Sequence, residues 1–219
     1  MDDHGNSDHL SSSLTDLMTS LMVIFILLLL VFISHTASKD PALTDLLLKE
    51  LKKDWHPQGF NENSIRLDPR DRNAILVIVP GDLMHFETQK ANLQDAGKQF
   101  LRTHIPAFAD VLCGNQFRSS IDSIVVEGHT DRQMYGRTAE ESQNNNLKLS
   151  QDRSMAVVEE SLADLKGQDS DRSCFLEKLS ATGRGEQDPE KTDDESRRVI
   201  FRIRVKARDE VTVSRRLPQ

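Results

Sequence analysis

The sequence predicts an α+β protein, in which a single N-terminal transmembrane helix precedes one βαβαβ sandwich domain. Residues 14–33 form one apolar run, LTDLMTSLMVIFILLLLVFI, and about 20 residues of this character are needed to cross a bilayer. From residue 65 onward, short apolar strands alternate with segments of helical periodicity. The chain has 219 residues, and the roughly 160–180 that follow the run are enough for one domain with its own core.

The N-terminal segment is predicted to remain attached as a membrane anchor. Residues 1–12 form a tail, and residues 13–34 form the transmembrane helix. A cleaved signal peptide would begin with a basic region, whereas residues 1–22 contain no Lys or Arg and are acidic. We therefore interpret the apolar run as an uncleaved anchor.

Asp16 lies at the leading edge of the apolar run. An acid within a transmembrane helix costs roughly 2.5–3.5 kcal/mol on insertion scales, so it usually has a function. Residues three and four apart share a helix face, so Asp16, Thr19 and Ser20 form one polar stripe, suited to a partner helix or a hydrated path. The alternative is that the membrane begins at Leu17 and that Asp16 is an interfacial residue near the helix N-terminus.

Charge and cysteine content point to opposite orientations of the anchor. The positive-inside rule places the basic residues that follow the run in the cytoplasm, namely Lys39, Lys49, Lys52 and Lys53. Cys113 and Cys174 are an even pair, which is consistent with a disulfide in an oxidising compartment. Two buried free thiols explain the same pair, so the residues alone leave the orientation open.

Residues 35–63 are predicted to be a linker that contains one amphipathic, plug-like helix. Its leucines follow helical spacing after Pro41, at Leu43, Leu46, Leu47 and Leu51, and its lysines lie on the other side. Three placements are open for this helix: pairing with its copy in a homodimer, covering a partner near the membrane, or packing against its own domain.

The domain itself is predicted over residues 64–207, and residues 208–219 form a C-terminal tail. Apolar runs bounded by turn residues predict strands, and apolar residues at helical spacing predict helices. Pro106 is expected to kink or end the first helix. The elements in order are strands 65–67 and 74–79, helix 91–112, strand 121–127, helices 147–165 and 174–179, and strand 199–205.

Several classes of function are disfavoured by the sequence. The net charge of −7, the few aromatic residues and the lack of a long basic block argue against direct binding of nucleic acid. Glu127, His129 and Asp131 alternate along the end of a predicted strand. We interpret His129 and its acidic neighbours as pointing to different faces, which would make them a poor metal or acid–base set. No catalytic residue and no metal site are predicted.

Three motifs carry a resemblance to a known family. Gly128-His129-Thr130-Asp131 is followed by N-x-x-L-S-x-x-R at residues 146–153 and by Arg-Arg-Val at 197–199. Together they resemble the OmpA-like peptidoglycan-binding domain over roughly residues 65–207. The resemblance implies that Asp131 and Arg153 hold the free carboxylate and amine ends of diaminopimelate in the cell-wall peptide, with Thr130 and Asn146 in supporting positions. From the residues alone, two other interpretations are open: Asp131 caps a turn, and Arg153 is a solvated residue on a helix.

One segment departs from the family pattern. Residues 132–145, RQMYGRTAEESQNN, form a longer connection than the family's usual loop. The resemblance therefore implies a reshaped or partly covered groove and an altered ligand preference.

The anchor and the domain together resemble the MotB type of stator subunit, because T-D-L-M-T-S-L-M precedes an OmpA-like domain. The resemblance implies that Asp16 binds a transported proton or sodium ion, that Thr19 and Ser20 support the ion path, and that no other cofactor is present. It implies a pentameric ring of A-type, MotA-like or ZorA-like, membrane subunits around a homodimer of this chain. It also implies a single pass through the bacterial inner membrane, with the N-terminus cytoplasmic and the domain periplasmic, where a disulfide between Cys113 and Cys174 is expected.

Among such motors, the acidic tail and short length resemble the B subunit of the Zorya anti-phage defence system, which signals to cytoplasmic effectors. A flagellar stator subunit is the nearest alternative. A passive OmpA-like cell-wall tether gives no reason for Asp16, and a TolR-type or ExbD-type transducer would lack the domain motifs.

Overall fold

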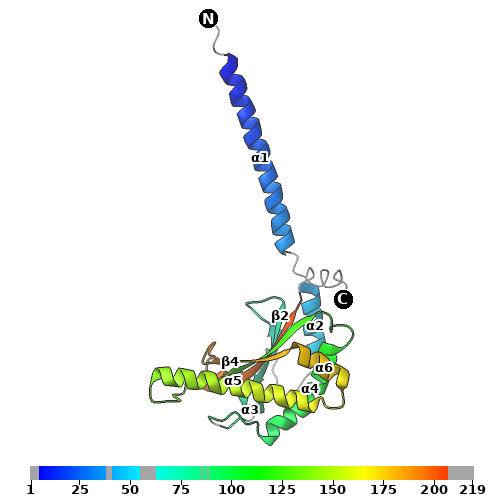
Figure 1. Ribbon diagram of the computed structural model, residues 1–219, viewed down its shortest axis with the longest axis vertical. Coiled ribbons are helices and arrows are strands. Elements are labelled where there is room, and N and C mark those ends of the chain that lie inside the picture. The colour runs from blue at the N-terminus through cyan, green and yellow to red at the C-terminus, as the bar shows by residue number, and fades with distance from the viewer. Residues whose placement is uncertain (1–4, 38–40, 55–62, 85, 88, 207–219) are drawn as a thin grey trace. The chain divides into compact units, whose positions relative to one another are not determined.

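The computed structural model describes residues 5–37, 41–54, 63–84, 86–87 and 89–206. The chain divides into two compact units, Met1–Lys39 and Asp40–Gln219. The first unit contains helix α1, Gly5–Ala37, which is one uninterrupted helix (Figure 1). Within the described part of the chain, none of the helices combines the length and apolar character needed to cross a membrane.

The second unit is built on one mixed five-stranded sheet. The order is β1-β2-β5-β3-β4, and every pair is antiparallel except β3 and β4, which run parallel. Since β2 and β3 both run antiparallel to β5, the carboxyl ends of β2 and β3 lie beside the amino end of β5, at one end of the central strands. The strands are β1 Ile65–Leu67, β2 Ala74–Pro80, β3 Ile121–His129, β4 Leu179–Gly185 and β5 Arg198–Val205.

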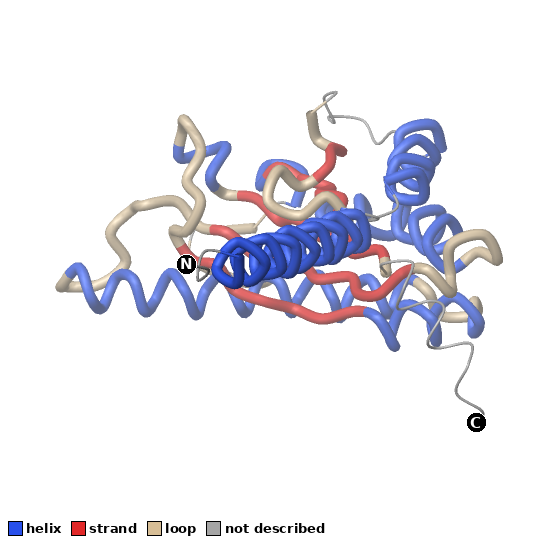
Figure 2. Tube along the Cα trace, turned by 90° about the horizontal axis from the view of Figure 1, so that it is seen from above, coloured by secondary structure: helices blue, strands red, loops and turns tan. Residues whose placement is uncertain are grey.

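Helices pack on one face of this sheet and complete the core, which confirms the predicted α+β class (Figures 1 and 2). Alternate residues of β5, Val199, Phe201 and Ile203, are buried among helical side chains such as Phe108 and Val157. The opposite face carries the arginines of β5, as the alternation of apolar and basic residues predicted. The helices of the unit are α2 Pro41–Asp54, α3 Gly81–Met84, α4 Asp95–Cys113, α5 Ala139–Asp164, α6 Asp169–Lys178 and α7 Asp193–Ser196.

Helix α2 packs against its own domain, which is one of the three placements that the sequence left open. Thr44, Leu47 and Leu51 lie at helical spacing and are at most 1% exposed. The side chains touch the region of β1 and α4. The lysines Lys49, Lys52 and Lys53 face outward, as expected.

Helix α4 begins later than expected and continues through Pro106 to Cys113. Pro106 has no N–H to donate to the carbonyl of Arg102, and Arg102 lies at the exposed surface, so the lost bond is tolerated. Buried Ile105, Phe108 and Ala109 keep the second half of the helix on the core. Of the two expectations for Pro106, an end to the helix is therefore wrong, whereas a kink stays a prediction.

Helix α5 begins at Ala139 and not at residue 147. The prediction that residues 132–145 form one long loop is therefore wrong. The Thr138 hydroxyl accepts a hydrogen bond from the Glu141 backbone N–H at 3.1 Å and so caps the helix. The first two turns are polar on every side, so they lack the apolar periodicity by which helices are found in a sequence. The segment between β3 and α5 is consequently short.

Strand β4 was not predicted, because Leu-Ser-Ala-Thr-Gly-Arg-Gly has neither an apolar run nor alternation. It is held at the sheet edge by α5. The Gly183 N–H donates to Gln151 Oε1 at 2.7 Å, and the Gly185 N–H donates to Ser150 Oγ at 2.8 Å. These side chains satisfy backbone groups that an edge strand would otherwise leave unpaired.

Helix α6 likewise starts at Asp169, five residues before the predicted start at Cys174. Cys113 and Cys174 form a disulfide that joins the end of α4 to α6 across a separation of 61 residues. A bridge over a loop of this length stabilises a domain by about 2–4 kcal/mol.

Candidate functional site

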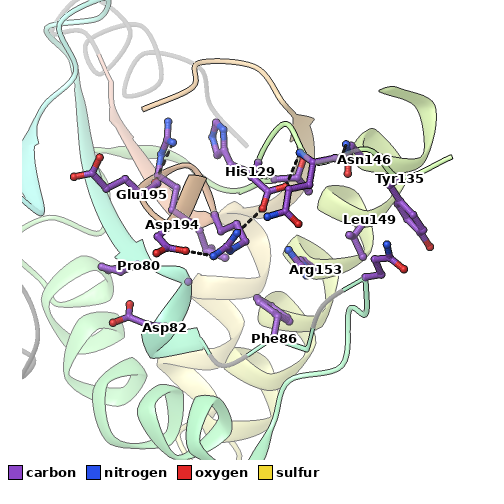
Figure 3. Close-up of a pocket in the computed structure, with 18 of the residues that line it drawn as sticks. Pro80, Asp82, Phe86, His129, Tyr135, Asn146, Leu149, Arg153, Asp194 and Glu195 are labelled. Carbon is purple, nitrogen blue, oxygen red and sulfur yellow. Dashed lines mark hydrogen bonds and ion pairs between the residues drawn. The ribbon is translucent and has the colours of Figure 1, made fainter. Parts of the chain in front are cut away.

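The site is a pocket of about 750 Å³ at the edge where β2 and β3 end and β5 begins (Figure 3). Its walls come from segments that are far apart in the sequence, namely residues 80–82, 86 with 89, 129–135, 146–153 and 194–199. The antiparallel order of β2, β5 and β3 brings these ends together. All four residues of the predicted wall-binding set, Thr130, Asp131, Asn146 and Arg153, line this pocket.

Asp131 lies two residues after the end of β3 and is 8% exposed. Its Oδ1 accepts a hydrogen bond from the Gln133 N–H at 3.0 Å, which is the turn cap considered from the sequence. Its Oδ2 accepts a second hydrogen bond from Arg197 Nη1 at 2.5 Å. The carboxylate is therefore both a local cap and one half of an ion pair inside the pocket.

Arg153 lies on α5 and is 6% exposed, so it is not the solvated helix residue of the alternative interpretation. Its Nε donates to the Lys90 carbonyl at 3.0 Å, and its Nη2 donates to the Glu87 carbonyl at 3.1 Å. The guanidinium carbon lies 5.1 Å from the centre of the Phe86 ring, in a cation–π contact. Burial lowers the pKa of Arg153, and the nearby Asp131 charge opposes that shift.

The contacts of Arg153 determine how it can hold a ligand. A guanidinium carries five N–H donors, and two of them are committed to backbone carbonyls. The two donors on Nη1 and the second donor on Nη2 remain for a carboxylate. The side chain is thus held rigidly while its outer end keeps its hydrogen-bonding capacity.

Asn146 and Thr130 complete the predicted set. Asn146 Nδ2 donates to the Glu186 side chain at 2.8 Å and to the Gln133 carbonyl at 3.2 Å, and so joins the 186–192 loop to the turn after Asp131. Among the described residues, the buried Thr130 hydroxyl has no hydrogen-bond partner. Its backbone N–H donates to the Gly185 carbonyl at 2.9 Å.

Arg197 is the site residue that the sequence analysis missed. It pairs with Asp131 from 66 positions away and also with Asp194 of α7. The doublet at 197–198 was noted as part of a motif, but its contacts follow only from the order of the strands. Arg198 also lines the pocket, and its Nη2 donates to the Asp188 carbonyl at 2.8 Å.

Glu127 and His129 lie on the same side of β3, so the expectation that they face different sides is wrong. Residues two apart in a strand share a face, and His129 Nε2 lies 3.8 Å from Glu127 Oε2. Glu127 in turn accepts a hydrogen bond from Arg202 Nε at 2.7 Å. Even so, no three His, Cys, Asp or Glu side chains are arranged to hold a metal ion in the parts of the chain that the structure describes.

The loop from residue 186 to 192 is braced by Asp188, which has a positive φ of 55°. Its carboxylate accepts hydrogen bonds from Arg70 Nη2 at 2.6 Å and from Arg184 Nη2 at 3.2 Å. The same loop contacts the pocket, because the Gln187 carbonyl lies 3.1 Å from His129 Nδ1. The hydrogen bonds from Arg70 lower the pKa of Asp188 from 3.8 to about 2.

This shift makes the stability of the domain depend on pH. A carboxyl group with a lowered pKa in the folded state contributes stability above its unfolded pKa, and the contribution is lost as pH falls from about 4 to about 2. Because the side chain is 33% exposed, we expect Asp188→Asn to cost only about 1–2 kcal/mol at pH 7.

Urea unfolding of the wild type and Asp188→Asn at pH 7 and at about pH 2.5 measures this effect. The lower pH lies about one unit below the pKa of Asp188 in the unfolded chain. The difference between the two proteins should shrink at the lower pH. Asp45→Asn on the exposed face of α2 is the control. An equal cost at both pH values would contradict the ionic role of Asp188.

The fold and the pocket together define an α+β domain with a charged pocket where its central strands end. Residues 85–200 match the OmpA family model, and the chain belongs to the OmpA family. The expected OmpA-like class is thereby confirmed. No curated protein matches the sequence significantly.

Three of the solved structures to which the chain is similar are the following. A putative MotB-like protein from Desulfovibrio vulgaris is 19% identical, with 75% of this chain and 92% of that chain covered and a TM-score of 0.47. The OmpA-like domain of FopA1 from Francisella tularensis is 22% identical, with 69% and 89% covered and a TM-score of 0.41. The periplasmic domain of Helicobacter pylori MotB is 15% identical, with 72% and 92% covered and a TM-score of 0.48.

Proposed function

We propose that the domain binds peptidoglycan through its pocket and anchors this chain to the cell wall. The observation that supports this function best is the placement of a buried acid, Asp131, and a buried base, Arg153, in one pocket. The free end of diaminopimelate carries a carboxylate and an ammonium group. Arg153 offers charge-assisted hydrogen bonds to the carboxylate, and Asp131 offers an ion pair to the ammonium.

The rigidity of the site supports the same function. Arg153 is fixed by the carbonyls of Glu87 and Lys90, and Asp131 is fixed by the Gln133 N–H. A preorganised site loses little side-chain entropy when a ligand binds. The neutral amide of Asn146 and the free hydroxyl of Thr130 add polar contacts without further charge.

We expect Arg153→Met to reduce binding to purified peptidoglycan by about 10-fold or more, because it removes the charged partner of the ligand carboxylate. Asp131→Asn should reduce binding by a smaller factor, because Asp131 also pairs with Arg197 in the unbound protein. Sedimentation of the purified protein with peptidoglycan measures the effect. Asp122→Asn and Arg118→Met are matched controls, since both residues lie at the opposite end of β3. Binding that is unchanged in Asp131→Asn and Arg153→Met would contradict the assignment of this pocket.

We further propose that α1 anchors the chain in the bacterial inner membrane. This part of the proposal rests on the sequence at residues 14–33, together with the exposure of the large apolar side chains from Leu17 to Phe32. The N-terminus is then cytoplasmic and the domain periplasmic. The disulfide between Cys113 and Cys174 supports this orientation, because disulfides persist in the oxidising periplasm.

The proposed role of the anchored chain is that of the B subunit of an ion-driven, stator-like motor. Asp16 takes up a proton or sodium ion inside a pentameric ring of A-type subunits, and a homodimer of this chain forms the axis. One charge that moves through 100 mV yields about 2.3 kcal/mol, and the wall-bound domain is the fixed point against which torque acts. Thr19 Oγ1 and Ser20 Oγ donate to the backbone carbonyls of Asp16 and Leu17, each at 3.0 Å, and we propose that both hydroxyls support the ion path.

We assign the motor to a Zorya-type anti-phage defence system that signals to cytoplasmic effectors. The acidic residues that precede the apolar run, Asp2, Asp3 and Asp8, support this choice over a flagellar stator. The same chain without a functional Asp16 would be a passive wall tether, so the test of the motor is the Asp16 variant described in the Discussion.

A further inference from the structure

In the unbound protein, Arg197 occupies the place beside Asp131 where the proposed ligand ammonium would bind. Arg197 Nη1 donates to Asp131 Oδ2 at 2.5 Å, and Arg197 Nη2 donates to Asp194. The dashed lines in Figure 3 mark these contacts, and Asp194 is labelled there. The guanidinium thus lies between two carboxylates that border the pocket.

The charge balance of the pocket explains why a cation lies there. A carboxylate that is 90% buried needs a counter-charge, and Arg197 supplies it to Asp131. The hydrogen bond to Asp131 raises the pKa of Arg197 in turn. A ligand ammonium that approaches Asp131 Oδ2 meets Arg197 Nη1, which already donates to that oxygen, so the two cations repel each other there.

Arg197 is also the arginine that can leave most easily. Arg153 and Arg198 are each 6% exposed and are bound to backbone carbonyls. The side chain of Arg197 is 37% exposed, and its second partner, Asp194, is 86% exposed. An ion pair at that exposure contributes about 0–1 kcal/mol, so only the Asp131 contact holds Arg197 in the pocket with any strength.

We infer that Arg197 is a specificity-determining residue that competes with the ligand's amine for Asp131. This inference rests on the proposed binding of a diaminopimelate peptide. Binding exchanges one cation for another at the Asp131 carboxylate, so the ligand amine contributes little net affinity. The carboxylate that binds Arg153 supplies most of it. The pocket therefore discriminates weakly between a free and a blocked amine.

The test compares two synthetic stem tripeptides that end in meso-diaminopimelate, one with a free side-chain amine and one with that amine acetylated. Calorimetric titration gives the affinity of each for the wild type, Arg197→Met and the control Arg118→Met. Arg197→Met keeps an unbranched apolar stem and removes the charged guanidinium. We expect it to bind the free-amine peptide about fivefold more tightly than the wild type does, because no internal cation must be displaced. Binding of the acetylated peptide should be unchanged.

Two other outcomes distinguish the failure of this inference from the failure of the proposed function. If Arg197→Met weakens binding of both peptides, Arg197 orients Asp131 for the ligand, and the competition is excluded while wall binding stands. If the folded wild type and Arg197→Met bind neither peptide, the proposed function fails and the inference with it. Thermal unfolding checks the fold of Arg197→Met, and Arg197→Gln replaces it if that variant is unfolded.

Discussion

Replacement of Gly128 by alanine is expected to destabilise the domain by more than about 3 kcal/mol, because a methyl group at this position meets backbone that cannot yield. A Cβ atom on Gly128 would lie 2.1 Å from the Ser150 carbonyl oxygen and 3.0 Å from its carbon. Ser150 lies in the middle of α5, whose neighbouring side chains Ser150 and Gln151 also hold strand β4. To relieve the contact, α5 would have to move away from the sheet.

Urea unfolding followed by circular dichroism measures the loss in Gly128→Ala. Gly167→Ala is a useful control, because Gly167 has a φ of 91° but no atom within 4 Å of its Cβ position. That variant reports backbone strain alone, which we expect to cost about 1–2 kcal/mol. A smaller loss in Gly128→Ala than in Gly167→Ala would show that α5 shifts easily, which would contradict the close packing described here.

Replacement of Asp16 by asparagine is expected to abolish the motor function completely. Asparagine has nearly the same size and shape, but it cannot take up and release a proton or pair with a sodium ion. The variant should still be produced and should still bind peptidoglycan, because Asp16 lies in the unit Met1–Lys39 and the pocket lies in the unit Asp40–Gln219.

The measurement uses cells that carry this chain together with its neighbouring A-type subunit and the genes beside it. Phage plating efficiency and swimming motility are compared for the wild type, Asp16→Asn and the control Asp45→Asn, which changes an exposed acid of α2. Loss of protection with normal swimming is the expected result. Loss of swimming would indicate a flagellar stator instead, and no effect on either would indicate a passive tether.

The parts of the fold that could be predicted from the sequence are those with a strong apolar pattern. The strands at Ala74–Pro80, Ile121–His129 and Arg198–Val205 supply buried side chains at regular intervals, and the expected strands lie within these bounds. The amino-terminal turns of α5 and the whole of β4 were missed. The Thr138 cap stabilises the first turn of α5, and side chains from the middle of α5, such as Ser150 bonded to Gly185, hold β4, so neither element depends on local apolar periodicity.

In the candidate site, too, local motifs were predicted from the sequence, whereas contacts between distant residues were not. Thr130, Asp131, Asn146 and Arg153 were found because they occupy two short motifs, and the structure places all four in one pocket. Their partners could not be found in this way. Arg197 is 66 positions from Asp131, and the carbonyls that hold Arg153 are 63 and 66 positions from it.

The sequence by itself therefore determined the α+β class, the OmpA family motifs and the charged pair Asp131 and Arg153 of the site. It did so because apolar periodicity and short motifs are local properties of a chain. Only the tertiary structure decided that α2 packs on its own domain, that α5 closes the edge of β4, and that Arg197 holds Asp131. These contacts join segments that the strand order β1-β2-β5-β3-β4 brings together, and such an order depends on the packing of the whole domain.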